Sequence, residues 1–368
     1  MRSAGPGRRR RLTVLTMLSV ALLVALVAVA NPQELLEELY QVDLGLLALV
    51  VGLYLGGMLM RALRWHVLMV AAGNGVRLRS SLVNFAIGQA IGDLTPVKVA
   101  GDVARVWGIN QEEGVPIGSG LASVVSERLM DLGLVSAVML LSLGMLYPTM
   151  PMSSWQVLAV AVGAVVAINL TIIVLMRRPQ LLRWLEAQAS RHLGRKGGAW
   201  RVRAERWVVD TLSSFTAAMV NTQDTNRRMT LSAAVLTVPV WGFEFARLFV
   251  IMAALGAFVS LPAVVVASTL ALTVQVFLPA GSGNVAVISD VFTSTGIGLA
   301  TATAGGLLSV ATSIWISVPL SLLALLLTGI GIGGGGRPKQ PTRLDAPAGW
   351  PERIGPCGPA APPSPPRP

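Results

Sequence analysis

The sequence predicts an all-α polytopic membrane protein with about six full spans and two re-entrant hairpins, eight apolar segments in all, arranged as an inverted repeat. Its 368 residues are 53% hydrophobic and only 13% charged, with a mean hydropathy of +0.66. Soluble domains carry about 25% charged residues, so this composition excludes an ordinary soluble domain. Several apolar runs also approach or exceed the roughly 20 residues that a helix needs to cross a bilayer.

The net charge of +11 does not predict nucleic-acid binding. The basic residues fall in a few short loops beside apolar runs, which is the pattern of loops retained in the cytoplasm. Cys357 is the only cysteine, so an intrachain disulfide and a cysteine-based metal site are both excluded. With only His66 and His192 besides, we expect no zinc centre, and the sequence predicts no cofactor.

The chain begins with a basic segment, 1–11, which contains four consecutive arginines. An apolar run follows at about 12–30 and ends Ala28-Val29-Ala30, which resembles a signal-peptidase site. Because a secretory apolar region is only about 7–15 residues long, we favour an uncleaved anchor over a signal peptide. The arginines would hold the N-terminus in the cytoplasm, and the transmembrane domain would extend over 12–330.

Charge bias orients the segments that follow. The loop 31–43 carries four acidic residues and no Lys or Arg, which places it outside. A span at about 44–62 then returns to the cytoplasm at Arg61, Arg64 and Trp65. Further full spans are expected at about 117–147, 155–176, 229–257 and 299–329.

A short apolar piece, 80–95, is expected to form the first re-entrant hairpin. It is too short to cross a bilayer, and Pro96 and three glycines interrupt the helical pattern around it. Broken backbone at membrane depth is tolerated only where protein or water covers it. A hairpin that enters from the cytoplasm and turns back keeps Lys98 and Arg105 on or near that side.

Two further segments are predicted to be cytoplasmic. The Arg-rich stretch 177–228 has apolar residues at helical spacing between its arginines. It fits an amphipathic helix on anionic lipid, and it fits equally an ordinary helix packed against the spans. The Gly- and Pro-rich tail 331–368 lacks the apolar content to fold. Both termini would therefore be cytoplasmic in a multi-pass protein of the cell membrane.

The order of span, short broken hairpin and span occurs twice, at about 44–147 and 229–329. The first hairpin opens from the cytoplasm, and the second, which begins near 263–278, opens from outside. Inverted repeats with Gly- and Pro-interrupted segments indicate a transporter whose binding site lies near the middle of the membrane.

Charged residues gather around the first hairpin, where burial in a membrane is costly and therefore points to function. These residues are Asp93, Lys98, Asp102, Arg105, Glu127, Arg128 and Asp131. Spacings of three and four residues bring Glu127, Arg128 and Asp131 toward one helix face. One arginine cannot neutralise two carboxylates, so a basic partner is needed, and Lys98, Arg105 or Arg61 could supply it. The cluster could bind a lipid head group, or it could be an ion network that only joins helices.

Arg61, Arg64, Lys98 and Arg105 are expected near the cytoplasmic mouth of this cavity. The forked guanidinium donors of arginine and the point charge of lysine both suit a phosphate. We therefore expect a membrane lipid partner of the anionic phospholipid or polyprenyl-phosphate type. The positive-inside pattern alone is the alternative explanation of these basic residues.

The second repeat offers weaker candidates. Glu244 and Arg247 are three residues apart in an apolar run, where a structural ion pair is the favoured interpretation. A short Gly-rich run could present free backbone N–H groups to an anion, or it could be a plain turn. Its candidate residues are Pro279, Gly281, Gly283 and Asn284.

Several motifs of the first repeat resemble the flippase-like membrane family that includes the membrane half of lysylphosphatidylglycerol synthase, the multiple peptide resistance factor. The order and spacing of the motifs carry the resemblance, which covers about 10–330. The motifs are Arg61-x-x-Arg64-Trp65, Gly88, Pro96, Gly101-Asp102-x-x-Arg105, Ala122-Ser123-Val124 and Glu127-Arg128-x-x-Asp131. In the second repeat the family's acid after the Gly-rich turn is missing, and the final span has no arginine.

The resemblance implies that the chain moves a lipid, such as an aminoacylated phospholipid or a polyprenyl-linked sugar, between leaflets. The synthase attaches its amino acid with a separate soluble domain, and no such domain is expected here, so we expect no enzymatic activity and no catalytic residue. One alternative is a scaffold that positions a separate lipid-modifying enzyme. Another is a membrane-embedded transferase with Asp93 or Asp102 as its general base.

Overall fold

The computed structural model describes residue 28 and residues 31–95, 99–149, 151–176, 199–222, 226–274 and 282–328. Within these ranges the regular secondary structure is entirely helical. The helices are α2 (Pro32–Tyr40), α3 (Leu44–Ala71), α4 (Leu78–Leu94), α5 (Val99–Glu113), α6 (Ile117–Leu146), η1 (Tyr147–Thr149), α7 (Met152–Met176), α9 (Ala199–Val220), α10 (Arg227–Ala254), α11 (Leu261–Val274), α12 (Ser282–Ser294) and α13 (Leu299–Thr328).

Five of the described helices, α3, α6, α7, α10 and α13, are long and apolar enough to cross a membrane. They confirm the polytopic all-α class, while the sixth predicted span, 12–30, lies outside the described residues. One boundary was wrong: α3 does not end near 62 but continues to Ala71. The interior of the helix can hold Arg61 and Arg64 because other helices supply partners for both guanidinium groups.

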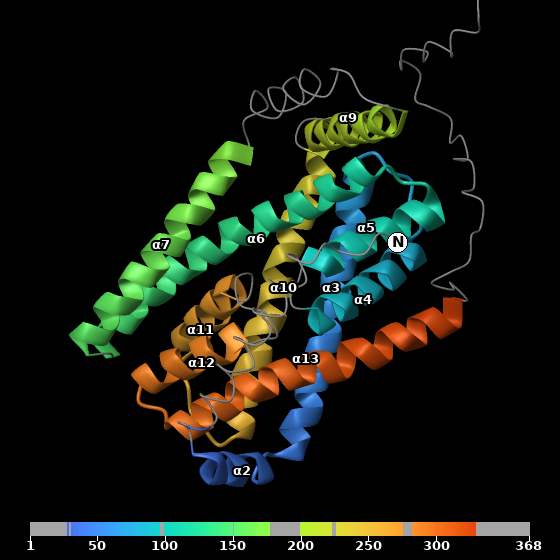
Figure 1. Ribbon diagram of the computed structural model, residues 1–368. Coiled ribbons are helices and arrows are strands. Elements are labelled where there is room, and N and C mark those ends of the chain that lie inside the picture. The colour runs from blue at the N-terminus through green and yellow to red at the C-terminus, as the bar shows by residue number, and fades with distance from the viewer. Residues whose placement is uncertain are drawn as a thin grey trace, which may run out of the picture.

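Helices α3 and α10 form a central antiparallel pair. The backbone N–H of Asp43 donates to the carbonyl of Ala254 (3.0 Å) at one end of the pair. At the other end, Nδ2 of Asn226 donates to the carbonyl of Ala71 (2.9 Å). Figure 1 shows the long helices α6 and α13 tilted across this pair.

Each of the two predicted hairpins is a contacting pair of short helices. Helix α4 packs against α5, and α11 packs against α12. The four helices have 17, 15, 14 and 13 residues, which is short of a full crossing. In addition, α4 contacts α13 and α11 contacts α6, so each hairpin packs on the long helix of the other half. The inverted relation between the halves stays a prediction.

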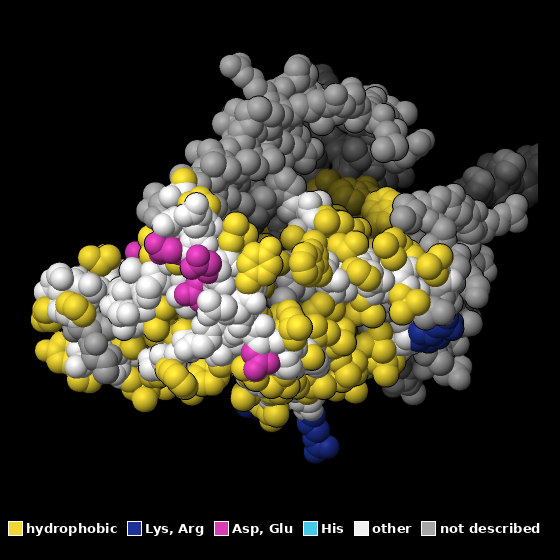
Figure 2. Space-filling model, turned by 90° about the horizontal axis from the view of Figure 1, so that it is seen from below, with side chains coloured by type: hydrophobic (Ala, Val, Ile, Leu, Met, Phe, Trp, Pro, Cys, Tyr) yellow, Lys and Arg dark blue, Asp and Glu magenta, His cyan; other side chains and the backbone are white. Residues whose placement is uncertain are grey.

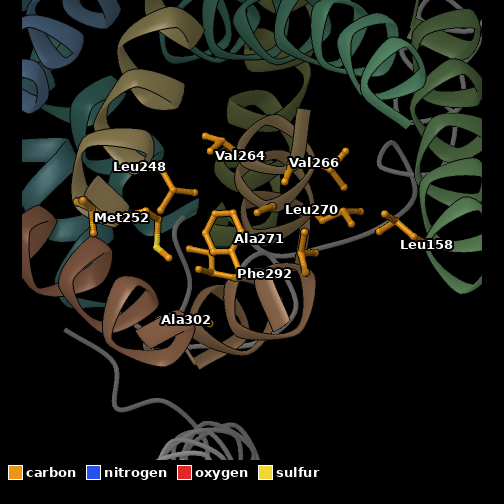
Figure 3. Packing of buried hydrophobic residues seen from close by; sticks show 14 of the residues in the cluster. Leu158, Leu248, Met252, Val264, Val266, Leu270, Ala271, Phe292 and Ala302 are labelled. Atoms are coloured by element: carbon orange, nitrogen blue, oxygen red, sulfur yellow. The ribbon is translucent and has the colours of Figure 1, made fainter. Parts of the chain in front are cut away.

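The largest apolar cluster lies where α6, α7 and α10 to α13 meet (Figure 3). Phe292, Met252 and Leu248 are almost fully buried there. Lipid tails are as apolar as these side chains, so close packing rather than release of water holds such helices together in a membrane. Gly306 fits this requirement, because a Cβ atom at this position would lie 2.9 Å from Cα of Val285.

The two ends of the molecule differ in charge. Figure 2 looks at the α2 end, where acidic side chains gather; Glu34, Glu37 and Glu38 of α2 line a hollow there. Two arginines lie at the other end of the central helices, away from α2. They are Arg77, which precedes α4, and Arg228, in the first turn of α10. This difference agrees with the charge of the loops in the sequence, and the orientation of the protein in the membrane stays a prediction.

The helix α9 occupies part of the predicted cytoplasmic segment. It packs against α6, and a Cβ atom at Gly118 would lie 2.0 Å from the carbonyl oxygen of Thr211. The structure therefore shows α9 packed against α6, and the cytoplasmic location of the segment stays a prediction. Trp207 is 56% exposed, and contact of α9 with a lipid surface stays a prediction.

The first hairpin depends on glycines at the contact between α4 and α5. A Cβ atom at Gly101 would lie 2.2 Å from the carbonyl oxygen of Gly88 and 2.9 Å from the backbone of Gly92. We expect Gly101→Ala to force the two helices apart and to cost about 1–3 kcal/mol of stability, as overpacking does. The measurement is the thermal unfolding midpoint of the purified protein in detergent.

Gly133→Ala is the matched control, because a Cβ atom there meets nothing within 4 Å. It should leave the midpoint unchanged or raise it slightly, since alanine favours a helix over glycine. Equal midpoints for the two variants would contradict the close approach of α4 and α5.

Candidate functional site

The most buried ion pairs of the structure surround Arg64, which lies in the last third of α3. Its side chain is only 2% exposed. Nη1 donates to Oδ1 of Asp131 (2.5 Å), and Nη2 donates to Oδ2 of Asp131 (3.1 Å) and to Oε1 of Glu127 (2.8 Å). Both carboxylates come from α6, four residues apart, so one arginine on α3 bridges them and leaves one negative charge for a second cation to balance.

Arg105 approaches the same carboxylates from α5 in the first hairpin. Its Nη2 donates to Oε2 of Glu127 (2.8 Å) and to Oδ1 of Asp102 (2.7 Å). The guanidinium carbon lies 5.0 Å from the ring centroid of Trp65 and 5.1 Å from that of Phe85. Aromatic faces stabilise a desolvated cation, so these rings help to hold the charge inside the protein.

Arg128 differs from the other two arginines because its side chain is 57% exposed. Nη2 donates to Oδ2 of Asp102 (2.9 Å), and Nη1 lies 4.0 Å from Oδ2 of Asp131. Arg128 stands eleven residues after the first residue of α6, or about 16 Å along the helix axis. That length is about half of a hydrocarbon layer of roughly 30 Å, but it is measured along a tilted helix, so the depth of Arg128 in the membrane stays a prediction.

These contacts define the first network. Its members are Arg64, Asp102, Arg105, Glu127, Arg128 and Asp131. Three guanidinium groups face three carboxylates, so the formal charges balance. The network joins α3, the first hairpin and α6, and Trp241 ties it to α10 by donating from Nε1 to Oδ1 of Asp131 (2.9 Å).

A second network lies along the same two central helices. Glu244 of α10 pairs with Arg61 of α3 and with Nη2 of Arg247 (2.6 Å). Nη1 of Arg247 donates to the backbone carbonyl of Ser309 in α13 (3.0 Å). The hydroxyl of Tyr54, whose ring lies 5.7 Å below the Arg247 guanidinium, donates to Oδ2 of Asp93 (3.3 Å). The members are Tyr54, Arg61, Asp93, Glu244 and Arg247.

The structure brings most of the predicted first-repeat residues together. The basic partners of the acidic face are Arg64 and Arg105, whereas Arg61 pairs with Glu244 instead. Arg64 and Arg105 were predicted at a cytoplasmic mouth; they are buried in the interior because carboxylates from α5 and α6 surround them. Pro96 and Lys98 lie outside the described residues.

In the second repeat, the predicted pair Glu244 and Arg247 forms as expected, but it also joins α3 and α13. Gly283 and Asn284 are buried at the start of α12. Pro279 and Gly281 lie outside the described residues. Whether any of these residues meets a ligand stays a prediction.

Sequence reasoning missed Tyr54 and Trp241 as members or neighbours of the networks, and it named Trp65 only within a motif, without its contacts. Tyr54 stands seven residues before Arg61, two helical turns away, so the spacing alone placed both on one face. Trp65 donates from Nε1 to Oγ of Ser123 in α6 (3.0 Å). This contact joins segments that are distant in the sequence, so no local pattern predicts it.

Other kinds of site find little support in the described part of the chain. No group of three or more His, Cys, Asp or Glu residues there could hold a metal ion. A cavity of about 440 Å³ lies at the α2 end, between α2 and the start of α13. Its acidic lining belongs to neither network.

Comparison with known proteins places the chain in a family. The family model described as the lysylphosphatidylglycerol synthase TM region matches residues 16–321. The chain belongs to this family. A relative, the UPF0104 membrane protein of Methanothermobacter thermautotrophicus, is 25% identical over 283 residues, which are 73% of this chain and 79% of the relative. No solved structure is significantly similar to the chain.

Membership of the lysylphosphatidylglycerol synthase TM region family confirms the resemblance drawn from the first-repeat motifs. The matched region is a membrane region rather than a catalytic domain. The chain is therefore a multi-helix membrane protein of a family named after lipid synthesis.

The first network should be essential for stability. Glu127→Gln would leave the buried Arg64 and Arg105 short of a carboxylate, and breaking a buried pair in this way costs about 3–5 kcal/mol. We expect a clearly lower unfolding midpoint in detergent. Glu34→Gln, an exposed acid of α2, is the control and should change the midpoint little.

The exposed part of the Arg128 side chain should be in contact with water. In a Cys357→Ser background, we expect Arg128→Cys to react with a membrane-impermeant maleimide, because a thiol reacts as the thiolate and needs water. Leu59→Cys is the control: Leu59 is 46% exposed near the middle of α3 and should face lipid tails. Equal protection of both cysteines would contradict a water-filled approach to Arg128.

Proposed function

We propose that this chain moves a membrane lipid between the two leaflets and that the polar head group passes Arg128 of the first network. One observation carries the proposal: a guanidinium is 57% exposed about 16 Å along a membrane-spanning helix. A charge at that depth is costly when it faces lipid tails. A water-filled path or a lipid head group beside Arg128 removes that cost.

The contacts of Arg128 support a binding role. Asp102 and Asp131 hold the guanidinium from one side, while more than half of the side chain remains accessible. Arg64 and Arg105, in contrast, are 1% and 3% exposed and fully surrounded by protein. A head group that approaches the first network therefore meets Arg128 first.

The arrangement of helices supports transport. A long helix, a short hairpin and a second long helix occur in both halves, and the long helices α3 and α10 run antiparallel. Such halves can rock against each other around a site near the middle of the membrane. The inverted repeat, with copies at about 44–147 and 229–329, is part of this proposal.

We place the basic end, with Arg77 and Arg228, in the cytoplasm of the cell and the acidic α2 end outside. The positive-inside rule supports this orientation. Both termini would then be cytoplasmic. A phospholipid or a polyprenyl-linked lipid is the proposed cargo, and a separate lipid-modifying enzyme is a proposed partner.

A non-transporting scaffold is the second candidate. The balance of charge in the first network favours it, because three arginines and three carboxylates can satisfy one another without a ligand. Such a network would only join α3, α5 and α6. The transferase alternative is weaker, since both oxygens of Asp102 already accept hydrogen bonds from arginines.

A leaflet-exchange assay in proteoliposomes tests the proposal. The lipids are labelled phosphatidylglycerol, lysyl-phosphatidylglycerol and a polyprenyl-phosphate sugar. We expect the wild type to accelerate exchange of at least one of them, and Arg128→Ala to slow that exchange about tenfold, as the loss of one charged hydrogen bond would.

Arg228→Ala is the control, since it removes one exposed arginine outside both networks. It should exchange lipid at the wild-type rate. No exchange of any of the three lipids by the folded wild type would overturn the transport proposal in favour of the scaffold.

A further inference from the structure

Helix α2 presents three different faces. Successive residues of an α-helix are turned by about 100° around its axis, so residues four apart share a face. Leu35 and Leu39 form the first face, which packs against the largest apolar cluster. Leu36 and Tyr40 form the second face, and these residues are 54% and 87% exposed. The third face is polar and lines the hollow at this end of the molecule, with Glu34, Glu37, Glu38 and Gln41.

Other exposed apolar residues accompany the second face of α2. Leu44, the first residue of α3, is 77% exposed. Phe258 and Leu261, at the connection between α10 and α11, are 99% and 59% exposed. The hydrogen bond from the backbone N–H of Asp43 to the carbonyl of Ala254 (3.0 Å) holds the start of α3 beside the end of α10. All of these apolar residues therefore lie at the α2 end of the molecule.

Carboxylates show that water must reach the same end. Glu34 and Glu37 are exposed on the polar face of α2 (Figure 2). Asp43 caps α3 by accepting from the backbone N–H groups of Gly45 (2.7 Å) and Leu46 (3.1 Å). Ionised carboxylates are costly in hydrocarbon. A helix with its side chains is about 10 Å wide, so water and the apolar face of α2 are separated by no more than that width.

The direction of α2 fits such a boundary. Figure 1 shows α2 lying across the end of α3 instead of continuing it. A helix that runs across the ends of membrane spans, with an apolar face beside a charged one, has the arrangement of an interfacial helix. Its charged face is acidic and gives no attraction to anionic lipid, so the apolar side chains must supply the binding.

We propose that α2 is an interfacial helix at the boundary between lipid and water. Leu36 and Tyr40 enter the upper part of the acyl chains, and the acidic face stays in the water. Phe258 is a second anchor in the same leaflet, because an exposed aromatic ring beside membrane spans is stabilised at that depth. This contact with the membrane does not depend on lipid transport by the chain.

A second copy of the chain is the competing occupant of the apolar face of α2. A stable protein interface buries about 800 Å² on each partner and involves about 20–30 residues on each side. The apolar face of α2 consists of two residues, and the acidic face lies beside it on the same helix. Lipid needs no such area. It also meets α3, which is long and apolar enough to cross the membrane and begins with the exposed Leu44.

The test compares two neighbouring residues of α2 that belong to different faces. In a Cys357→Ser background, an environment-sensitive fluorophore is attached to Leu36→Cys or to Glu37→Cys, and the full chain is placed in lipid nanodiscs. Iodide in the water and a spin label near the carbonyl groups of the lipid serve as quenchers. Nanodiscs leave both faces of the bilayer open to iodide, so the orientation of the protein does not affect the result.

We expect the label at Leu36→Cys to be quenched by the spin-labelled lipid and protected from iodide. The label at Glu37→Cys, the matched control, should be quenched by iodide and should emit at longer wavelength. Tyr40→Cys should behave like Leu36→Cys, since the two residues are one helical turn apart. Phe258→Cys should do the same if it is the second anchor.

Two results would overturn the proposal. Equal quenching of Leu36→Cys and Glu37→Cys by iodide would show that α2 stands in water. Protection of Leu36→Cys from both quenchers would show that protein covers the apolar face, and a disulfide-linked dimer of Tyr40→Cys would identify a second copy as the cover. The substituted residues are exposed, so the variants should fold, and an unfolding midpoint in detergent equal to that of the wild type checks this.

Discussion

A buried arginine in an apolar helix requires carboxylates from other helices, and this requirement organises the structure. Arg64 sits in the interior of α3 with 1% of its surface exposed. An unpaired charge there would be prohibitively costly, so α6 must present Glu127 and Asp131 to it. Arg105 of the first hairpin joins the same cluster because the second carboxylate oxygen of Glu127 accepts its hydrogen bond. The relative positions of α3, α5 and α6 thus depend on one shared set of ion pairs.

The first hairpin supplies charged partners that the long helices do not provide for one another. Short helices leave backbone and polar side chains at membrane depth, where they are tolerated only if protein or water covers them. Glycines let α4 and α5 approach until backbone meets backbone, as at Gly88 and Gly101. This close pairing brings Asp102 to Arg128 and Arg105 to Glu127. The first hairpin therefore carries one side of the first network.

The two networks differ in what they leave accessible. In the first, Arg128 is exposed while its carboxylate partners are mostly covered. In the second, Arg247 is buried against α13, and its bonds reach the backbone of Ser309. This asymmetry fits the weaker motifs of the second half, which lacks the acid and the arginine expected from the family resemblance. The first half is the better candidate for ligand contact, and the second half for holding α3, α10 and α13 together.

The sequence alone determined the membrane class, the short lengths of the hairpins and the approximate limits of the spans, except for the C-terminal end of α3. Hydropathy and helix length are local properties, so a run of apolar residues reveals them without knowledge of the fold. The charged cluster from Asp102 to Asp131 was also visible, because charge within an apolar region is conspicuous. Only the tertiary structure decided which charges meet: Arg64 rather than Arg61 pairs with α6, and Trp241 of α10 joins Asp131. Those contacts link residues separated by 67 and 110 positions. No local pattern encodes such pairings, because they depend on how the helices pack.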